Sequence, residues 1–337
     1  KVQAASHSFR AIVPDDEMVL ESRPFPGTGL SRPRVPDWQR YKPRRLRQGC
    51  AQGGVLGGSF PFGEIEMKRI ICGIVLCLSL TGAGFAVELD GVRDAGVMSV
   101  AVYEDFAPFS DESRGIDREI ATKLGEKLGV KVSFRPFKAD ENVDDDLRNM
   151  VSRGSLLGHG PADVMMHVPV QKEFAQRNER VAIFGAYFRD NLQIARNLER
   201  VPELRYLDGL ANEIVGVEGD TLGADILASP SGGVRPREVR HYMDIQEAFA
   251  DLKAGKLGAV LALGSQAQAA MGKEKGFAVE LAPLHGRVPP AGWAFGLAVK
   301  SEREQLAQAL KKAMVELEQD GTLDAIFRAH NVRRVRP

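Results

Sequence analysis

Cysteine is scarce in this chain, and the three that it has all precede residue 87. They are Cys50, Cys72 and Cys77. Residues 87–337 therefore contain no thiol, and no disulfide or cysteine chemistry is expected there. The motifs GxSxG, HExxH and the P-loop are absent as well. The chain therefore lacks the usual sequence evidence for a serine hydrolase, a zinc protease or a nucleotide-binding enzyme.

A net charge is also missing, because 45 Lys and Arg balance 45 Asp and Glu. The balance hides two different parts of the chain. Residues 1–86 hold 12 basic and 7 acidic side chains, which leaves 33 basic and 38 acidic ones in residues 87–337. A mildly acidic main part lacks the clustered basic face that general nucleic-acid binding requires. We expect no nucleic-acid partner.

No apolar run reaches the roughly 20 residues that a membrane-spanning helix needs. The segment 67–86, MKRIICGIVLCLSLTGAGFA, has instead the three parts of a secretory signal peptide. A basic start at Lys68 and Arg69 precedes an apolar core, and Gly84 and Ala86 place small residues before a cleavage site. We expect export to the periplasm and no membrane insertion after cleavage.

Residues 1–66 show no sustained hydrophobic period and carry Arg-Pro and Gly-Gly clusters. Such a segment buries too little apolar surface to offset its ordering entropy, so we expect disorder. Since a signal peptide works at an N-terminus, we expect translation to begin at Met67, with 1–66 being upstream sequence. A basic nucleic-acid-binding arm around Arg44, Arg45 and Arg47 is the weaker alternative.

Residues 97–329 alternate strand-like and helix-like patterns, which predicts an α/β class with largely parallel sheets. The expected strands are 97–103, 130–134, 163–168, 192–195, 213–217, one within 234–242, 259–263 and 293–299. The expected helices are 116–128, 143–151, 221–228, 245–252, 302–318 and 323–329.

Four stretches of this alternation resemble extracellular solute-binding proteins of the family-3 type. They are SVAVYEDFAPF (99–109), GIDREIATKLGEKLGVKVSF (115–134), DIQEAFADLKAGKLGAVLA (244–262) and WAFGLAVKSEREQLAQALKKAMVELEQDGTLDAIF (293–327). Members of that family are periplasmic clamshells, mostly feeding amino acids to ABC transporters. The resemblance implies two α/β lobes joined by two crossover segments, near 193–197 and 289–292. Lobe 1 would comprise 95–193 plus 293–330, and lobe 2 would comprise 197–288.

The resemblance also implies a small-molecule site between the lobes, beyond strand ends and helix starts. Aromatic side chains would supply an apolar or stacking wall, and Thr221 would offer its hydroxyl to a carboxylate or serve only as a helix cap. The expected ligand-binding residues are Tyr103, Phe106, Phe109, His167, Val168, Arg177, Gln193, Thr221 and Leu263. We expect no cofactor and no metal.

Two of these positions depart from the amino-acid binders. Arg177 matches the arginine that grips the ligand carboxylate only with a two-residue shift, and Leu263 stands where an acidic residue holds the α-ammonium. No nearby carboxylate in sequence replaces it, so an α-amino acid is expected to bury its ammonium unpaired, which costs free energy.

Other readings stay open. The segment 153–169 resembles binding-protein-like proteins associated with quinoprotein alcohol dehydrogenases, which makes an accessory protein of such an enzyme the alternative to a transport protein. A dehydratase on the same fold would need a buried acid in the loop of Glu104 and Asp105. His159 and His167 flank Asp163 without a metal-site pattern. The arginines at 328–336 are expected to form a solvated basic tail.

Overall fold

The computed structural model describes residues 87–337 except 141, 155–157, 159, 229–235, 285–287 and 290. The expected signal peptide, the upstream segment 1–66 and His159 lie outside these residues. The described strands form two five-stranded sheets, each covered by helices on both faces. The prediction of two α/β lobes is therefore confirmed.

The sheet of lobe 1 has the strand order β2-β1-β3-β10-β4. Its strands are β1 (Val97–Tyr103), β2 (Lys131–Phe137), β3 (Val164–Pro169), β4 (Val181–Asp190) and β10 (Trp293–Lys300). Its helices are α2 (Val87–Ala95), α3 (Ile116–Leu128), α4 (Val143–Leu147) with a π-helical turn at Arg148–Ser152, α5 (Lys172–Arg177), α9 (Glu304–Gln319) and α10 (Thr322–Ala329).

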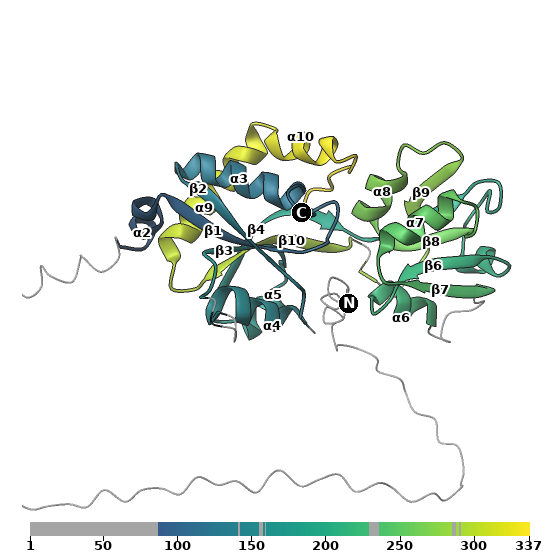
Figure 1. The fold of residues 1–337 in the computed structure, drawn as a ribbon, viewed down its shortest axis with the longest axis horizontal. Helices are drawn as coiled ribbons and strands as arrows, with labels where there is room; N and C mark the ends of the chain where they lie inside the picture. The colour runs from purple at the N-terminus through teal and green to yellow at the C-terminus, as the bar shows by residue number, and fades with distance from the viewer. Residues whose placement is uncertain are drawn as a thin grey trace, which may run out of the picture. The chain divides into compact units, whose positions relative to one another are not determined.

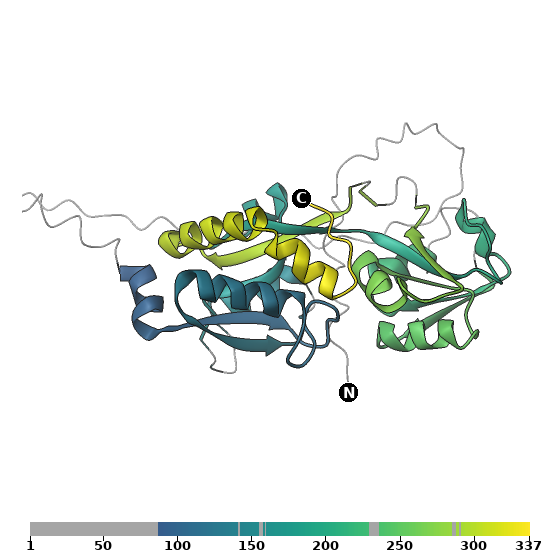
Figure 2. The ribbon, with the colours of Figure 1, turned by 90° about the horizontal axis from the view of Figure 1, so that it is seen from above.

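The helices of lobe 1 cover the two faces of its sheet (Figures 1 and 2). Helices α3, α9 and α10 pack together on one face, whereas α4 and α5 lie on the other. The apolar residues of α3 recur every four positions, which places Ile120 and Leu124 in the core. Gly129 ends α3 in a left-handed conformation, as the sequence predicted.

The sheet of lobe 2 has the strand order β7-β6-β8-β5-β9. Its strands are β5 (Leu192–Asn197), β6 (Ile214–Glu218), β7 (Glu238–Tyr242), β8 (Ala259–Leu263) and β9 (Phe277–Leu281). Its helices are α6 (Leu222–Ala228), α7 (Ile245–Lys253) and α8 (Gly264–Met271), with a 3₁₀ turn at Leu207–Leu210. Val260 and Ala262 of β8 face α7 and α8, and Leu261 faces α6.

The sheets are mixed, so the expectation of largely parallel sheets was wrong. Strand β10 is antiparallel to both of its neighbours, and β5 is antiparallel to β8 and β9. The reason is the connection between lobes. Strand β4 leads through Asn191 into β5, which therefore enters the sheet of lobe 2 from the opposite end to its neighbours β8 and β9. Strand β10 returns from lobe 2 and enters the sheet of lobe 1 from the opposite end to its neighbours β3 and β4.

Several elements were missed by the sequence patterns: α2, α5, α8, β4 and β9. Strand β4 does not alternate regularly between buried and exposed residues, because Gly185 adopts φ 64° beside a register shift in its pairing with β10. The alternation of buried and exposed residues that indicates a strand is therefore missing from β4.

The two crossings between the lobes touch each other. Trp293, at the start of β10, pairs with Asp190, at the end of β4. Gly292 has φ 65°, and a Cβ at this position would lie 2.0 Å from the carbonyl oxygen of Asp190. Only glycine allows this approach. Residues 193–197 lie within β5, and the chain leaves the first sheet at Asn191.

The expectation of a solvated basic tail was wrong for Arg334, whose side chain is only 3% exposed. Its guanidinium pairs with Glu318 and Asp324 and donates to the carbonyl oxygen of Tyr187 at 2.7 Å. The backbone N–H of Arg189 donates to the carbonyl oxygen of Val335. This hydrogen bond holds the tail against the end of β4.

Candidate functional site

The loop after β1 is closed on itself and on α3. Phe106 and Ser110 exchange two backbone hydrogen bonds of 2.7 and 2.9 Å. Gly115 lets α3 begin directly behind this loop, since a Cβ there would lie 2.2 Å from the carbonyl oxygen of Phe109. The first free N–H groups of α3 donate to the carbonyl oxygens of Pro108 and Phe109. The helix start is thus already satisfied by the protein.

Two adjoining cavities lie where this loop meets strand ends of lobe 2. The inner cavity has a volume of about 30 Å³. The outer cavity has a volume of about 320 Å³ and shares four lining residues with the inner one: Phe106, Glu218, Ile245 and Gln266. The inner cavity is completed by Leu192, Thr221, Leu222, Gly223, Leu261, Ala262, Leu263 and Trp293. Open α/β sheets bind ligands at such carboxyl ends of strands.

Three polar side chains of the inner cavity have no hydrogen-bond partner among the described residues. The indole Nε1 of Trp293 is buried and unpaired, and Trp293 is 4% exposed. No described side chain bonds the carboxylate of Glu218 or the amide of the buried Gln266. Buried polar groups are normally satisfied, so an indole donor without an acceptor points to a bound molecule.

The electrostatics of the site depend on Glu218. Burial, with a smaller contribution from Asp244, raises the pKa of Glu218 to about 7. The outer cavity adds one cation, Lys138. Its carboxylates number five: Glu104, Asp105, Asp111, Glu218 and Asp244.

Three of the predicted ligand residues line the inner cavity: Phe106, Thr221 and Leu263. Thr221 also serves as a helix cap. Its hydroxyl donates to the carbonyl oxygen of Glu218 at 2.8 Å and accepts from the N–H of Ala224 at 3.2 Å. Its hydroxyl is therefore held by the start of α6, as the alternative reading had it.

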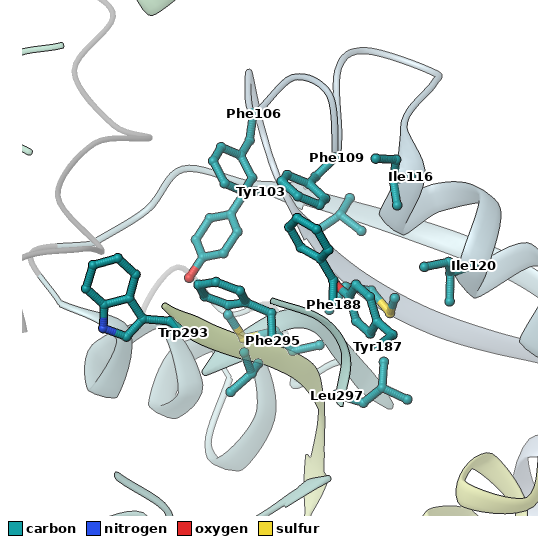
Figure 3. Close-up of a cluster of buried hydrophobic side chains, with 14 of the residues drawn as sticks. Tyr103, Phe106, Phe109, Ile116, Ile120, Tyr187, Phe188, Trp293, Phe295 and Leu297 are labelled. Carbon is teal, nitrogen blue, oxygen red and sulfur yellow. The ribbon is translucent and has the colours of Figure 1, made fainter. Parts of the chain in front are cut away.

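Three other predicted residues belong to the core of lobe 1 and do not line either cavity. Tyr103 donates its hydroxyl to Asp146 at 2.9 Å. Phe109 and Val168 are fully buried. Figure 3 shows Phe109 packed among the rings of this core, with Trp293 at its edge.

His167 is likewise buried in lobe 1, at φ 58°. Its Nδ1 lies 3.3 Å from Asp117, which also accepts the hydroxyl of Tyr187 at 2.5 Å. Its ring lies 4.2 and 4.3 Å from the ring centroids of Phe109 and Phe295. These rings and Phe106 surround His167, so it faces the lobe core and not the cavities.

Arg177 and Gln193 also lie away from the cavities. Arg177 is on the surface end of α5, where it binds Asp144 at 3.1 Å and stacks on Phe174. Gln193, in β5, bonds Asn191 and Gln268. Arg177 is not among the residues that line either cavity.

The expectation of an unpaired ammonium stays a prediction, but a carboxylate lines the same cavity as Leu263. Glu218 ends β6 and Leu263 ends β8, and these strands are parallel neighbours, so Glu218 supplies a carboxylate in the cavity that Leu263 lines. Sequence reasoning missed Glu218, Gln266 and Trp293. Glu218 had a signal, because it directly follows the expected strand 213–217 and lies just before the expected helix 221–228.

Within the described part of the chain, no three His, Cys, Asp or Glu side chains come together as a possible metal site. No helix in that part is long and apolar enough to cross a membrane.

Comparison with known proteins places the fold. No model of a known protein family matches this chain. The L-cystine-binding protein TcyJ of Escherichia coli (strain K12) is 24% identical over 270 residues, which cover 76% of this chain and 91% of that protein.

Solved structures match over a similar share of the chain. An ancestral cationic amino-acid solute-binding protein has a TM-score of 0.58 at 19% identity, covering 72% of this chain and 99% of its own. A polar amino-acid ABC uptake transporter substrate-binding protein from Streptococcus thermophilus has a TM-score of 0.56 at 17% identity, covering 76% and 94%. The fold is thus the two-lobed clamshell of the periplasmic binding proteins.

Proposed function

We propose that this chain is a solute-binding protein that captures a small polar solute of the amino-acid class in its two cavities and serves an ABC transporter. One observation carries the proposal: Glu218, Gln266 and Trp293 face one cavity and lack partners among the described residues. Their carboxylate, amide and N–H groups suit a ligand that carries both a donor and an acceptor.

Capture works by closure of the lobes. The ligand touches Phe106 from lobe 1 and Glu218 from lobe 2, so it favours the conformation in which both contacts form. Lobe 1 comprises 95–190 plus 293–330. Lobe 2 runs from 192 to 288 and so begins earlier than the expected 197, because β5 belongs to the second sheet. The chain bends at its two crossings. Residues 67–86 direct export, and the protein works in the periplasm with a separate permease and ATPase.

Binding without catalysis is the function that the similarities support, since both TcyJ and the solute-binding proteins above are named for what they bind. The accessory protein of a quinoprotein dehydrogenase gains no support from them. Glu218 favours a second candidate, a dehydratase, because a buried carboxyl with a pKa of about 7 can protonate a leaving group. Proton NMR of the ligand during incubation separates the two, because elimination creates vinylic protons and binding leaves the spectrum of the ligand unchanged.

A thermal-shift screen of the full chain tests the proposal, with amino acids, L-cystine, amines, amine-free carboxylates and alcohols as ligands. A ligand at 100 times its Kd adds about 2.7 kcal/mol to the free energy of unfolding. For a domain of this size that raises Tm by roughly 2–4 °C. The absence of a shift with every class contradicts the proposal.

A matched pair of variants shows whether the shift comes from the cavities. Leu263→Phe places a larger side chain in the inner cavity and is expected to abolish the rise in Tm caused by the ligand. Leu281→Phe makes the same change on β9 at a side chain that is 57% exposed, and is expected to keep it. A shift that survives Leu263→Phe places the ligand elsewhere.

A further inference from the structure

Residues 332–337, which we call the C-terminal strap, follow α10 and are attached to lobe 1 at three points. Val332 is 3% exposed and belongs to the hydrophobic core. The guanidinium of Arg334 is buried in the contacts with lobe 1 described above. The carbonyl oxygen of Val335 accepts from the N–H of Arg189 in β4 at 2.9 Å. The strap is therefore fixed to lobe 1, beside the strand that crosses into lobe 2.

The strap also reaches lobe 2. The backbone N–H of Arg333 donates to the side-chain amide oxygen of Gln268, in α8, at 2.8 Å. Among the described residues, this single hydrogen bond, which we call the latch, joins the strap to lobe 2. A cavity of about 710 Å³ lies beside it, lined by Lys273 of lobe 2 together with residues of α10 and the strap. Figures 1 and 2 show the chain passing beside α8 after it leaves α10. The strap is thus anchored strongly on one lobe and held by one hydrogen bond on the other.

Gln268 connects the latch to the point where the chain crosses between the lobes. Its Nε2 donates to the side-chain oxygen of Gln193 at 3.0 Å, and the Nε2 of Gln193 donates to Asn191 at 3.1 Å. Asn191 is the residue between β4 and β5. Because Arg333 is held by lobe 1 and Gln268 by lobe 2, a rotation of the lobes about this crossing strains or breaks the latch.

The helix that the latch holds also lines the ligand cavities. Gln266 lies two residues before Gln268 in α8, and it lines both cavities together with Phe106 of lobe 1. The latch is formed in the conformation in which residues of both lobes share these cavities. It therefore favours this conformation over one in which the lobes have separated. A neutral hydrogen bond changes such an equilibrium by about two- to tenfold.

We propose that the C-terminal strap is a third connection between the lobes, which holds α8 through Gln268 and keeps the lobes close to their ligand-binding arrangement. The latch acts in the absence of ligand, because both of its groups belong to the protein. Its consequence for binding rests on the proposed function. A protein that spends more time in the binding-competent conformation has a lower apparent Kd, so the strap raises the affinity for the solute.

A matched pair of variants tests the latch. Arg333→Pro removes the N–H that donates to Gln268. Arg333→Ala is the control, because it removes the same exposed side chain and keeps the N–H. Both are made in the full chain with its three cysteines replaced by serine.

Spin labels on Ser113→Cys and Glu247→Cys report the separation of the lobes. Both positions are exposed, and they lie close in sequence to Asp111 and Gln246, which line the outer cavity. Double electron–electron resonance without ligand is expected to show a fraction of long distances that is about two- to tenfold larger in Arg333→Pro than in the parent chain. Arg333→Ala is expected to match the parent. Identical distance distributions in the two variants overturn the inference.

If Arg333→Pro fails to fold, Gln268→Met removes the acceptor from the other side, and Gln268→Glu is its control because it keeps the oxygen. The same increase in long distances is expected in Gln268→Met alone, and its absence contradicts the latch. These distances are measured without ligand, so a thermal-shift screen in which no solute binds overturns the proposed function but not the latch. For a solute that does raise Tm, the Kd is expected to rise about two- to tenfold in Arg333→Pro, and an unchanged Kd overturns the consequence for binding.

Discussion

The hydroxyl of Ser265 donates a hydrogen bond of 2.5 Å to the carboxylate of Asp190. Asp190 ends β4 in lobe 1, and Ser265 lies in the first turn of α8 in lobe 2. The same carboxylate accepts from the backbone N–H groups of Asn191 and Ser265, and burial raises the pKa of Asp190. A buried carboxylate therefore links the two lobes where the chain crosses.

Removal of this hydroxyl is expected to destabilise the protein. Ser265→Ala leaves the buried Asp190 with one donor fewer, and the free energy of unfolding is expected to fall by about 1–3 kcal/mol. Urea denaturation of the full chain measures the change. Ser133→Ala, at an exposed position of β2, is the control and is expected to change it by less than about 0.5 kcal/mol. Equal stability of the two variants would show that Asp190 does not need the hydroxyl.

Stability is expected to depend on pH through Asp146. Burial raises the pKa of Asp146 to about 7 from an ordinary value of 3.8. A carboxyl whose pKa is raised by folding holds more protons in the folded state between these values, so the free energy of unfolding falls as pH rises from about 4 to about 7. The cost of the ionised group is complete above pH 7 and absent below pH 4.

Asp146→Asn is expected to flatten this profile and to make the protein about as stable or more stable at pH 8. Each pKa unit corresponds to about 1.4 kcal/mol, so the flattening amounts to about 2–4 kcal/mol. Urea denaturation at pH 4.5, 6 and 8 measures it. Asp208→Asn, at an exposed position, is the control. An unaltered pH profile in Asp146→Asn contradicts the prediction.

Arg334 is expected to contribute more stability than its neighbour Arg336. Arg334 is 3% exposed and serves Glu318, Asp324 and the carbonyl oxygen of Tyr187, whereas Arg336 is 64% exposed and pairs with the same two acids. Arg334→Ala is expected to cost about 1–3 kcal/mol, because the acids are partly solvated and the buried carbonyl loses its donor. Arg336→Ala is expected to cost less than about 0.5 kcal/mol. Thermal unfolding compares them, and equal losses of Tm would refute the difference.

Binding of a ligand that carries an ammonium is expected to weaken as the pH falls through 7. The raised pKa of Glu218 means that the carboxyl becomes protonated below about pH 7 and then no longer attracts an ammonium. Affinity is expected to drop towards tenfold per pH unit below that value and to level off above it. Asp244 contributes to this shift, and Glu104, Asp105, Asp111 and Lys138 line the same cavity. Calorimetry between pH 5.5 and 8.5 gives the profile.

Glu218→Gln is expected to bind such a ligand weakly at every pH and to show a much flatter profile. A profile as steep as that of the unaltered protein would assign the proton to another group.

Local patterns predicted much of this fold, because they directly reflect burial. The fourfold spacing in α3, the continuous apolar residues of β8 and the glycine after α3 each correspond to an observed feature. Mixed sheets could not be predicted in this way, since the direction of β10 depends on where the chain returns from lobe 2. Strand β4 escaped because Gly185 interrupts its alternation.

The candidate site was harder to predict, since its polar groups come from distant segments. Glu218, Gln266 and Trp293 meet only after β6, α8 and β10 are placed. Phe109 and Phe106 belong to one loop and look alike in sequence, yet only Phe106 lines the cavities. Which ring of a loop faces the core is decided by packing that no local pattern contains.

Trp293 gives this protein a built-in optical probe. The chain contains two tryptophans, Trp38 and Trp293, and the indole of Trp293 forms a wall of the inner cavity. A molecule that enters the cavity replaces water beside this fluorophore and alters its emission. In a Trp38→Phe background, the intrinsic fluorescence of a single residue would then report occupancy directly, without a label and on the timescale of a stopped-flow mixing experiment.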